Sequence, residues 1–205
     1  MSKYRFKNSS IYIGDSDLPH NKLSISDPLE LHAIENELLI EAYELFYDRI
    51  NEETIFDEAY IISLHKATFS PLYDWAGEYR TLDMSKGDSR FCLAAYLHES
   101  SKKIFDELSH DKSIYQGDSL SIEEFAHKLA YYKCELIALH PFYELNGRIT
   151  RMFFDMIAAY NGYPFIDYSG ITPEAYIDAS IECVQFANCS KMEKIILEGL
   201  HEAKK

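Results

Sequence analysis

The chain has 205 residues, with 20 Lys and Arg against 34 Asp and Glu, so its formal charge is −14 with histidine neutral. A chain of this length can form one domain with a full core, and its aromatic content of 14% argues against disorder. The acidic balance argues against binding of nucleic acid through a broad basic face, because neutralising phosphates requires clustered Lys and Arg.

The sequence predicts neither a membrane span nor a secretory signal. Charges such as Asp155 interrupt the apolar stretches. No apolar stretch approaches the roughly 20 residues that a membrane span requires. No apolar block follows the early cations Lys3, Arg5 and Lys7. The four cysteines lack C-x-x-C spacing, so we expect reduced thiols in or near the core and a cytoplasmic protein.

In chain order, the first strong helix signal is a capping box with proline at the first helical position. Asp27 is the predicted N-cap, Pro28 follows it, and Glu30 takes the capping-box position. Apolar residues then recur at near-helical spacing, which predicts a helix that runs to about Ile50. The same periodicity predicts a second helix over residues 57–69.

The stretch over residues 71–90 has a different pattern. Short extended pieces flank a Lys-Gly-Asp turn at residues 86–88, which predicts a small hairpin as the only strands. Further helices are predicted over about residues 93–108, 121–140 and 147–160, from Thr172, and from Ser190. The sequence therefore predicts an all-α fold with one hairpin.

One polar segment, HPFYELNGRITR over residues 140–151, joins two of the predicted helices by a short turn. Asn146 and Gly147 can adopt tight conformations that let backbone N–H groups converge on an anion at a helix start. Arg148 and Arg151 occupy the first turn of that helix, where the dipole disfavours cations. A bound anion would explain both arginines.

Two more side chains of this segment suggest phosphate chemistry. Glu144 offers a hard oxygen ligand that suits Mg²⁺ beside phosphates, and His140 offers a base for an attacking hydroxyl. The combination predicts phosphoryl or nucleotidyl transfer. Each residue alone also has a structural explanation: His140 as a helix cap, Glu144 as a solvated carboxylate, and the arginines as partners of nearby glutamates.

The segment resembles the active-site signature of the Fic family, H-P-F-x-[D/E]-G-N-G-R-x-x-R. It matches at His140, Pro141, Phe142, Glu144, Asn146, Gly147, Arg148 and Arg151. Residues 21–31 are similar to the start of many bacterial Fic domains, and residues 65–91 resemble the helix-to-flap stretch of the family. The resemblance spans about residues 20–190 and is to Fic/Doc proteins of the bacterial cell filamentation type.

The resemblance implies a Fic-type helical bundle with a small β-hairpin flap beside the active-site loop. Residues 1–20 would form an N-terminal arm, residues 21–190 the Fic domain, and residues 191–205 a C-terminal helix. It also implies a protein adenylyltransferase, which moves AMP from ATP and Mg²⁺ to a Ser, Thr or Tyr hydroxyl of a target protein.

The resemblance further implies a role for each matched residue. His140 would be the catalytic base and Glu144 the Mg²⁺ ligand. Arg151 would position the γ-phosphate or meet an inhibitory glutamate. Phosphates would be bound by Asn146, Gly147 and Arg148. A flap over about residues 82–90 would dock the target through Ser85, Lys86 and Gly87.

Leu145 departs from the signature, because it stands where the family has its first glycine. A left-handed backbone costs a non-glycine residue roughly 1–2 kcal/mol, whereas a right-handed one costs little. The isobutyl group would also crowd the phosphates. We therefore expect an active enzyme, and a weakened or altered reaction stays open as the alternative.

Fic proteins are often inhibited by a helix with the motif [S/T]-x-x-x-E-[G/N]. No segment of this chain completes the motif, and Glu198-Gly199 has Lys194 in place of Ser or Thr. We therefore expect inhibition by a separate, small, antitoxin-like protein.

Two alternatives to protein adenylylation stay open. One is transfer of another nucleotide or of a phosphate on the same scaffold, and the other is a catalytically silent binding protein that docks peptides on its hairpin. The histidines other than His140 show no ligand spacing, so a surface or core position is expected for each.

Overall fold

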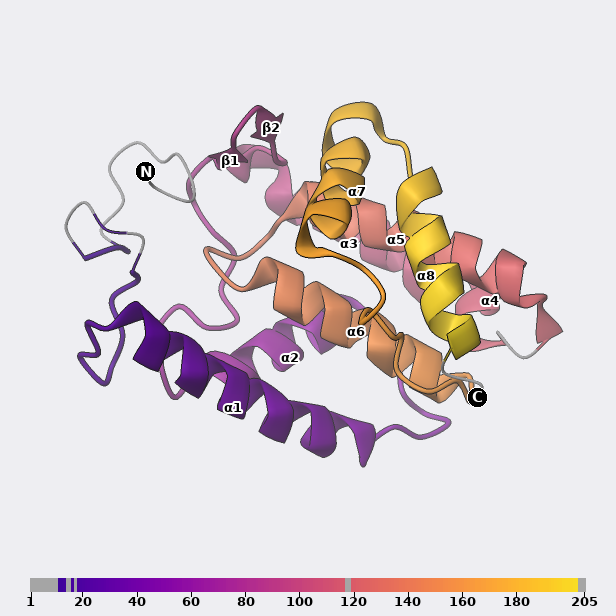
Figure 1. Ribbon diagram of the computed structural model, residues 1–205, viewed down its shortest axis with the longest axis horizontal. Coiled ribbons are helices and arrows are strands. Elements are labelled where there is room, and N and C mark those ends of the chain that lie inside the picture. The colour runs from indigo at the N-terminus through magenta and orange to yellow at the C-terminus, as the bar shows by residue number, and fades with distance from the viewer. Residues whose placement is uncertain (1–10, 14–15, 17, 117–118, 203–205) are drawn as a thin grey trace.

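The computed structural model describes residues 11–13, 16, 18–116 and 119–202. Within these residues the chain forms eight α-helices and one antiparallel hairpin, which confirms the predicted fold class (Figure 1). The hairpin pairs β1 (Ser85–Lys86) with β2 (Ser89–Arg90), and a 3-10 turn, η1 (Ala94–Tyr96), follows it. The helices are α1 (Pro28–Tyr47), α2 (Glu58–Phe69), α3 (Leu97–His110), α4 (Lys112–Tyr115), α5 (Ile122–Leu139), α6 (Asn146–Tyr160), α7 (Pro173–Phe186) and α8 (Ser190–Glu202).

Helices α1 and α5 begin at the predicted caps, whereas α3 and α6 begin without a side-chain cap. Asp27 accepts a backbone N–H of the first turn of α1, and Ser121 forms a reciprocal capping box with Glu124 at the start of α5. The first helix ends at Tyr47 rather than at about Ile50. The chain there turns tightly, and the N–H of Ile50 donates to the Tyr47 carbonyl at 3.2 Å.

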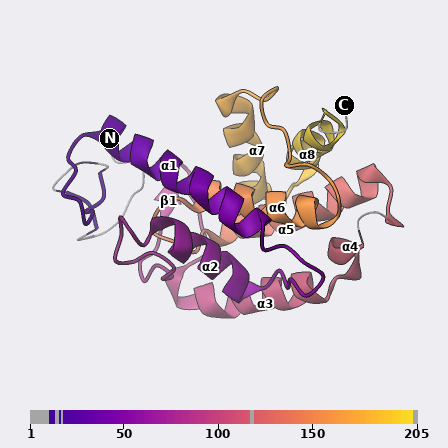
Figure 2. The ribbon, with the colours of Figure 1, turned by 90° about the horizontal axis from the view of Figure 1, so that it is seen from below.

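Helices α5 and α6 form the centre of the molecule. Helix α5 contacts α3, α4, α6, α7 and α8, and α6 also contacts α1, α2 and α4. Figure 1 shows α1 and α2 on one side of α6, with α7 and α8 on the other, and Figure 2 shows α2 and α3 together on the far side from α7 and α8. The loop that connects α5 to α6 therefore lies between α1 and α2 on one side and α7 and α8 on the other.

Aromatic rings fix α6 in the core. The ring of Phe153 meets those of Phe56, Phe105 and Phe154 edge to face, with centroids 6.0, 5.9 and 5.4 Å away. Such pairs contribute about 0.5–1.5 kcal/mol each beyond the burial of their area. Because α6 begins at Asn146, this packing also fixes the end of the loop that precedes it.

The hairpin stands against the C-terminal half of α7. Gly87 takes the left-handed backbone of the turn, with φ 57°, and Lys86 pairs with Ser89 across it. Gln185 of α7 donates a side-chain hydrogen bond to Ser89 Oγ at 3.2 Å, and Val184 packs on the apolar residues that flank the strands. Helix α7 thus supports the flap through contacts with β2.

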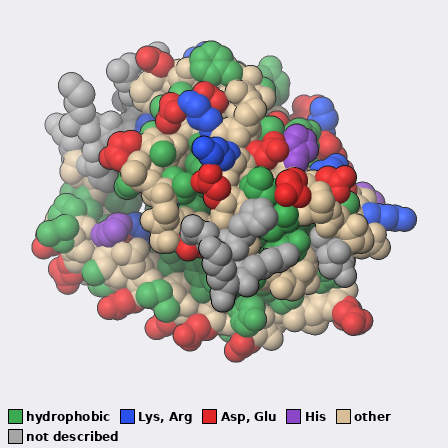
Figure 3. Space-filling view, turned by 45° about the vertical axis from the view of Figure 1, so that its right-hand side comes forward, with side chains coloured by type: hydrophobic (Ala, Val, Ile, Leu, Met, Phe, Trp, Pro, Cys, Tyr) green, Lys and Arg blue, Asp and Glu red, His purple; other side chains and the backbone are tan. Residues whose placement is uncertain are grey.

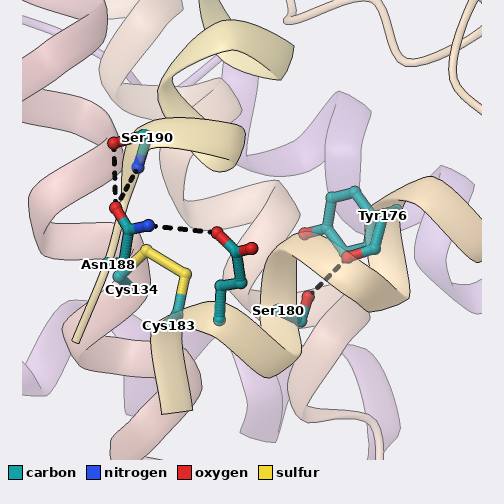
Figure 4. Close-up of a disulfide and its surroundings, with 7 residues drawn as sticks. Cys134, Tyr176, Ser180, Cys183, Asn188 and Ser190 are labelled. Atoms are coloured by element: carbon teal, nitrogen blue, oxygen red, sulfur yellow. Dashed lines mark hydrogen bonds between the residues drawn. A yellow bond between two sulfur atoms is a disulfide. The ribbon is translucent and has the colours of Figure 1, made fainter. Parts of the chain in front are cut away.

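A disulfide joins α5 to α7, between Cys134 and Cys183 (Figure 4). The expectation of reduced thiols is therefore wrong for this pair, whereas Cys92 and Cys189 are free. The two helices pack together and bring the Cα atoms within 4.9 Å, although the cysteines are 49 residues apart in sequence. No spacing rule connects residues that far apart, because their meeting depends on how the helices pack.

Acidic side chains are spread over the surface. On the face in Figure 3, Asp and Glu occupy much of the outline, and the Lys and Arg side chains are scattered among them. Over the described ranges of the chain, no helix is both long and apolar enough to cross a bilayer.

Candidate active site

A cavity of about 690 Å³ opens between the hairpin, α1, the start of α6 and one face of α7. This volume lies in the range of pockets that hold small ligands. Ser85 is not part of its wall. The other predicted site residues all line it, namely Lys86, Gly87, His140, Glu144, Asn146, Gly147, Arg148 and Arg151.

His140 ends α5 with a left-handed backbone, at φ 47° and ψ 60°. Pro141 follows and cannot continue the helix, so the chain turns at the point where the imidazole enters the cavity wall. The ring stacks on Phe91, directly after the hairpin, with centroids 3.8 Å apart and planes 10° apart. The predicted base is thus held between the end of α5 and the flap.

Arg80 is a buried residue that ties the His140 turn to the base of the hairpin. Its Nε donates to the carbonyl of His140 at 2.7 Å, and its Nη2 donates to that of Leu139 at 3.2 Å. Other guanidinium N–H groups donate to the carbonyls of Leu82 and Cys92. The sequence assigned Arg80 no individual role, because a buried arginine that satisfies carbonyls has no local signature.

Glu144 is buried at 4% exposure, so it is not a solvated loop carboxylate. Tyr12 Oη donates to Glu144 Oε1 at 2.6 Å, across 132 residues of sequence. Tyr12 also pairs with Pro19 in an antiparallel bridge, and Leu18 and Pro19 line the cavity. The described part of the predicted N-terminal arm therefore belongs to the site, whereas residues 1–10, 14–15 and 17 lie outside the description. No motif marked Tyr12 in the sequence.

Glu35 and Glu144 are the two carboxylates that the described residues contribute to the cavity wall. Glu35 pairs with Arg148, whereas Glu144 belongs to the loop directly before α6 and is therefore the candidate beside a phosphate site. In the described part of the chain, no three His, Cys, Asp or Glu side chains cluster closely enough to hold a metal by themselves. Mg²⁺ bound by one carboxylate and phosphate oxygens does not require such a cluster.

His65 is buried in the core, one of the two positions predicted for it, and its ring contacts the loop that carries Glu144. Its Nδ1 accepts the N–H of Gly77 at 2.9 Å, which leaves Nε2 to donate to the Glu144 carbonyl at 3.2 Å. The ring stacks on Phe142 with centroids 3.9 Å apart. Burial lowers the pKa of His65 to about 4, so the imidazole is neutral near pH 7.

Leu145 adopts a left-handed backbone, at φ 66° and ψ 9°, directly before α6. Of the two possibilities raised by the sequence, the strained one therefore occurs. The Asn146 side chain accepts the N–H of Phe142 at 2.8 Å and donates to its carbonyl at 2.7 Å. The Asn146 amide thus braces the loop, and the backbone N–H groups of Asn146 and Gly147 open the helix without intrahelical partners.

Arg148 forms an ion pair with Glu35 of α1, with Nη1 2.9 Å from Oε2. Tyr73 Oη donates to the other carboxylate oxygen, Glu35 Oε1, at 2.6 Å. A glutamate partner for this arginine was one expected explanation, but its partner lies 113 residues away on another helix. Sequence patterns showed no link between α1 and the loop.

Arg151 has a different environment from Arg148. Its guanidinium carbon lies 5.2 Å from the ring centroid of Tyr176 on α7, and the described residues place no carboxylate within ion-pair distance of it. Behind this pair, burial lowers the pKa of Lys133 and raises the pKa of Asp155. Arg151 thus lines the cavity without a carboxylate partner from the described chain, which suits it to an anionic ligand.

The degenerate inhibitory motif lies away from the cavity. Glu198 is half exposed on α8, and its nearest cation is Lys194, with Nζ 3.8 Å from Oε1. Neither residue lines the cavity.

The fold and the site together define a helical protein with a cavity-lining loop between two central helices and a hairpin beside it. A sequence model of the Fic/DOC family matches residues 55–158, which include this loop, the hairpin and most of α6. The chain therefore belongs to the Fic/DOC family, and the resemblance seen in the sequence is confirmed.

Curated relatives match most of the chain. The chain is 30% identical over 203 residues to protein adenylyltransferase VbhT of Bartonella schoenbuchensis, which covers 98% of this chain and 41% of VbhT. It is 29% identical over 185 residues to a Sinorhizobium fredii protein named "Probable protein adenylyltransferase y4lH", covering 88% of this chain and 91% of y4lH. The chain thus spans less than half of VbhT but nearly all of y4lH.

A solved structure has the same fold. It is the N-terminal Fic domain of a VirB-translocated Bep effector protein from Bartonella quintana, with bound ADP. The two chains are 26% identical and superpose with a TM-score of 0.77, over 92% of this chain and 93% of that one.

Proposed function

We propose that this chain is a protein adenylyltransferase, which transfers AMP from ATP to a Ser, Thr or Tyr hydroxyl of another protein. The observation that carries the proposal is the cavity wall, which brings His140, Glu144, Arg148 and the start of α6 to one nucleotide-sized space. The relatives named as adenylyltransferases and the ADP in the Bartonella quintana domain support it.

In the proposed reaction, His140 is the general base. As the target hydroxyl oxygen attacks the α-phosphorus of ATP, the imidazole takes the hydroxyl proton. The new O–P bond forms as the bond from the α-phosphorus to the bridging oxygen breaks, so pyrophosphate leaves and AMP stays on the target. The stacking on Phe91 and the bond from Arg80 to the His140 carbonyl support this role, because they restrict the ring.

The first turn of α6 would bind the phosphates. The N–H groups of Asn146 and Gly147 carry the positive end of the helix dipole, and Arg148 and Arg151 add two guanidinium groups beside them. These donors would also stabilise the charge that develops on the phosphate oxygens during transfer.

Glu144 would hold Mg²⁺ together with phosphate oxygens of ATP. A buried carboxylate in the wall of a phosphate site is the oxygen donor that this ion prefers, so the residues present fit it. The bound ion would neutralise phosphate charge. The hydroxyl of Tyr12 would fix the orientation of the carboxylate through its bond to Oε1.

The hairpin would dock the target protein. Ser85, Lys86 and Gly87 form its first strand and turn, and a strand added to this edge would bring a hydroxyl towards the cavity. The inhibitor would be a separate antitoxin-like protein, since the described residues offer Arg151 no glutamate. A cytoplasmic location belongs to the same proposal.

The decisive experiment follows the label of ATP. With Mg²⁺ and a cell extract, addition of the chain should label a protein of the extract from α-labelled ATP, and it should add no label from γ-labelled ATP beyond that of the extract alone. Replacement of the base, His140→Ala, should lower incorporation by roughly a hundredfold or more. Binding of a non-hydrolysable ATP analogue, measured by calorimetry, should persist in that variant.

Each other outcome selects a different function. Label from the γ position alone would indicate phosphate transfer on the same scaffold. Absence of nucleotide binding would indicate a silent docking protein and overturn the proposal.

A further inference from the structure

We infer that Glu35 of α1 is a positioning residue that orients the Arg148 guanidinium for the phosphates of ATP. The inference deepens the proposed function and rests on it. Arg148 Nη1 lies 2.9 Å from Glu35 Oε2, and both side chains line the cavity. A helix that is far from the loop in sequence thus reaches one of its phosphate-binding candidates.

Glu35 is itself held in place. Tyr73 Oη donates to its second oxygen at 2.6 Å, and the Tyr73 ring stacks on Trp75 with centroids 4.5 Å apart. Glu35 also projects from a helix of 20 residues that packs on α2 and α6. Because Tyr73 and the packing of α1 hold the carboxylate independently of Arg148, Glu35 is a rigid support rather than a mobile counter-ion.

The pair leaves Arg148 able to bind a ligand. A guanidinium has five N–H donors, and the contact with Glu35 uses Nη1. The Arg148 side chain keeps 18% of its surface exposed, at the cavity. A free arginine loses side-chain entropy when it binds phosphate, whereas an arginine already held by a carboxylate has lost much of it on folding. Orientation by Glu35 should therefore strengthen nucleotide binding.

A carboxylate on the same arginine could instead compete with the phosphates. The geometry favours support, because a contact at one nitrogen leaves the remaining donors open and the buried Glu35 need not leave. The two roles predict opposite results when Glu35 is neutralised, and so they can be separated by experiment.

The test measures nucleotide affinity and AMP transfer in Glu35→Gln. The amide keeps the size of the side chain and an oxygen for the Tyr73 hydroxyl, but it removes the charge. We expect both the Kd for a non-hydrolysable ATP analogue with Mg²⁺ and the KM for ATP to rise roughly tenfold, as for other partners of ligand-binding residues. The kcat should change by much less, because His140 is untouched.

Matched variants separate positioning from a general effect on the fold. Glu37→Gln removes an exposed charge from the same helix and should leave affinity unchanged. Tyr73→Phe should also weaken binding of the ATP analogue, but by less than Glu35→Gln. It provides the test of positioning by Glu35 if Glu35→Gln does not fold. In an Arg148→Gln background, Glu35→Gln should have little further effect, because it acts through that arginine.

Equal or tighter binding of the analogue by Glu35→Gln would overturn the inference and indicate a competing anion. The same loss in the Arg148→Gln background would also overturn it, since the effect would then not pass through the arginine. Failure of the wild type to transfer α-label would refute the proposed function, whereas the binding measurement would still report on the pair.

Discussion

Two residues of the candidate active-site loop, His140 and Leu145, have left-handed backbones although neither is glycine. Such a backbone costs roughly 1–2 kcal/mol per residue, and it persists only where the surroundings fix it. Here the surroundings are the Arg80 bonds to the end of α5 and the Asn146 bonds to Phe142. The loop is therefore held in its shape before any ligand arrives.

Leu145→Gly should raise self-labelling from α-labelled ATP. The substitution removes a non-glycine residue from left-handed φ and an isobutyl group from the cavity wall. Relief of about 1 kcal/mol in the transition state would correspond to about a fivefold faster reaction. The measurement is the initial rate of labelling, compared at equal folded concentration because Leu145 is also a core residue.

Leu145→Ala is the matched control for this prediction. It removes most of the side chain but keeps the Cβ that disfavours left-handed φ. A gain in the glycine variant alone would assign the effect to the backbone, and an equal gain in both would assign it to crowding. Equal or lower labelling in the glycine variant would show that Leu145 does not damp activity.

His65 should make the protein less stable in mild acid. Its pKa is about 4 in the folded chain against 6.5 for an ordinary histidine, so between these values the unfolded chain binds more protons. The free energy of unfolding should then fall by on the order of 3 kcal/mol as the pH drops from 6.5 to 4. Urea unfolding at several pH values measures this loss.

His65→Asn provides the comparison, because its amide oxygen can replace Nδ1 as the acceptor of the Gly77 N–H and the side chain does not titrate. Its stability should change less with pH over the same window. An unchanged slope would mean that other groups cause the acid sensitivity.

At the scale of elements, α5 and α7 act as one support for the site. Helix α5 ends at Leu139 with His140 as its C-cap, and α7 supplies Tyr176 to the cavity wall and Gln185 to the flap. The disulfide in Figure 4 joins these two helices between Cys134 and Cys183. It therefore ties the helix that leads to His140 to the helix that forms another part of the cavity wall.

Cleavage of this disulfide should destabilise the fold. It closes a loop across 49 residues, and loops of that size predict a loss of about 2–4 kcal/mol on reduction. Denaturant unfolding with and without reductant measures the difference, and Cys134→Ser should behave like the reduced wild type. A double variant of the free thiols, Cys92→Ser with Cys189→Ser, should respond to reductant as the wild type does. Insensitivity of the wild type to reductant would contradict the prediction.

At the scale of the whole molecule, the cavity collects segments from most of the chain, from Leu18 in the arm to Val184 in α7. Helix α8 does not reach it but buries Met192, Ile196 and Leu200 in the same core. Helix α8 packs on α5, so it supports the site through the helix that carries His140.

Glu198→Ala should leave AMP transfer unchanged within about twofold, because an exposed surface charge remote from a site contributes little. Glu198 is half exposed and pairs with Lys194 away from the cavity. The initial rate of α-label transfer is the measurement, with Lys194→Ala as the partner control. A marked gain would indicate that α8 inhibits the chain itself and would count against a separate inhibitor.

The sequence by itself determined the described helices other than the short α4, which it did not predict, together with the hairpin and the segment over residues 140–151 that carries the candidate site. These features depend on caps, prolines, turn residues and periodicity, which act between residues a few positions apart. The departure at Leu145 was visible for the same reason, because a signature compares neighbouring positions.

Only the tertiary structure decided which distant residues complete the site. The pairs Glu35–Arg148 and Tyr12–Glu144, and the disulfide between α5 and α7, join residues 113, 132 and 49 positions apart. The backbone sign of φ at Leu145 also depended on the packing around the loop. No local pattern encodes such contacts, because they arise when apolar helix faces are buried against one another and bring their polar residues together.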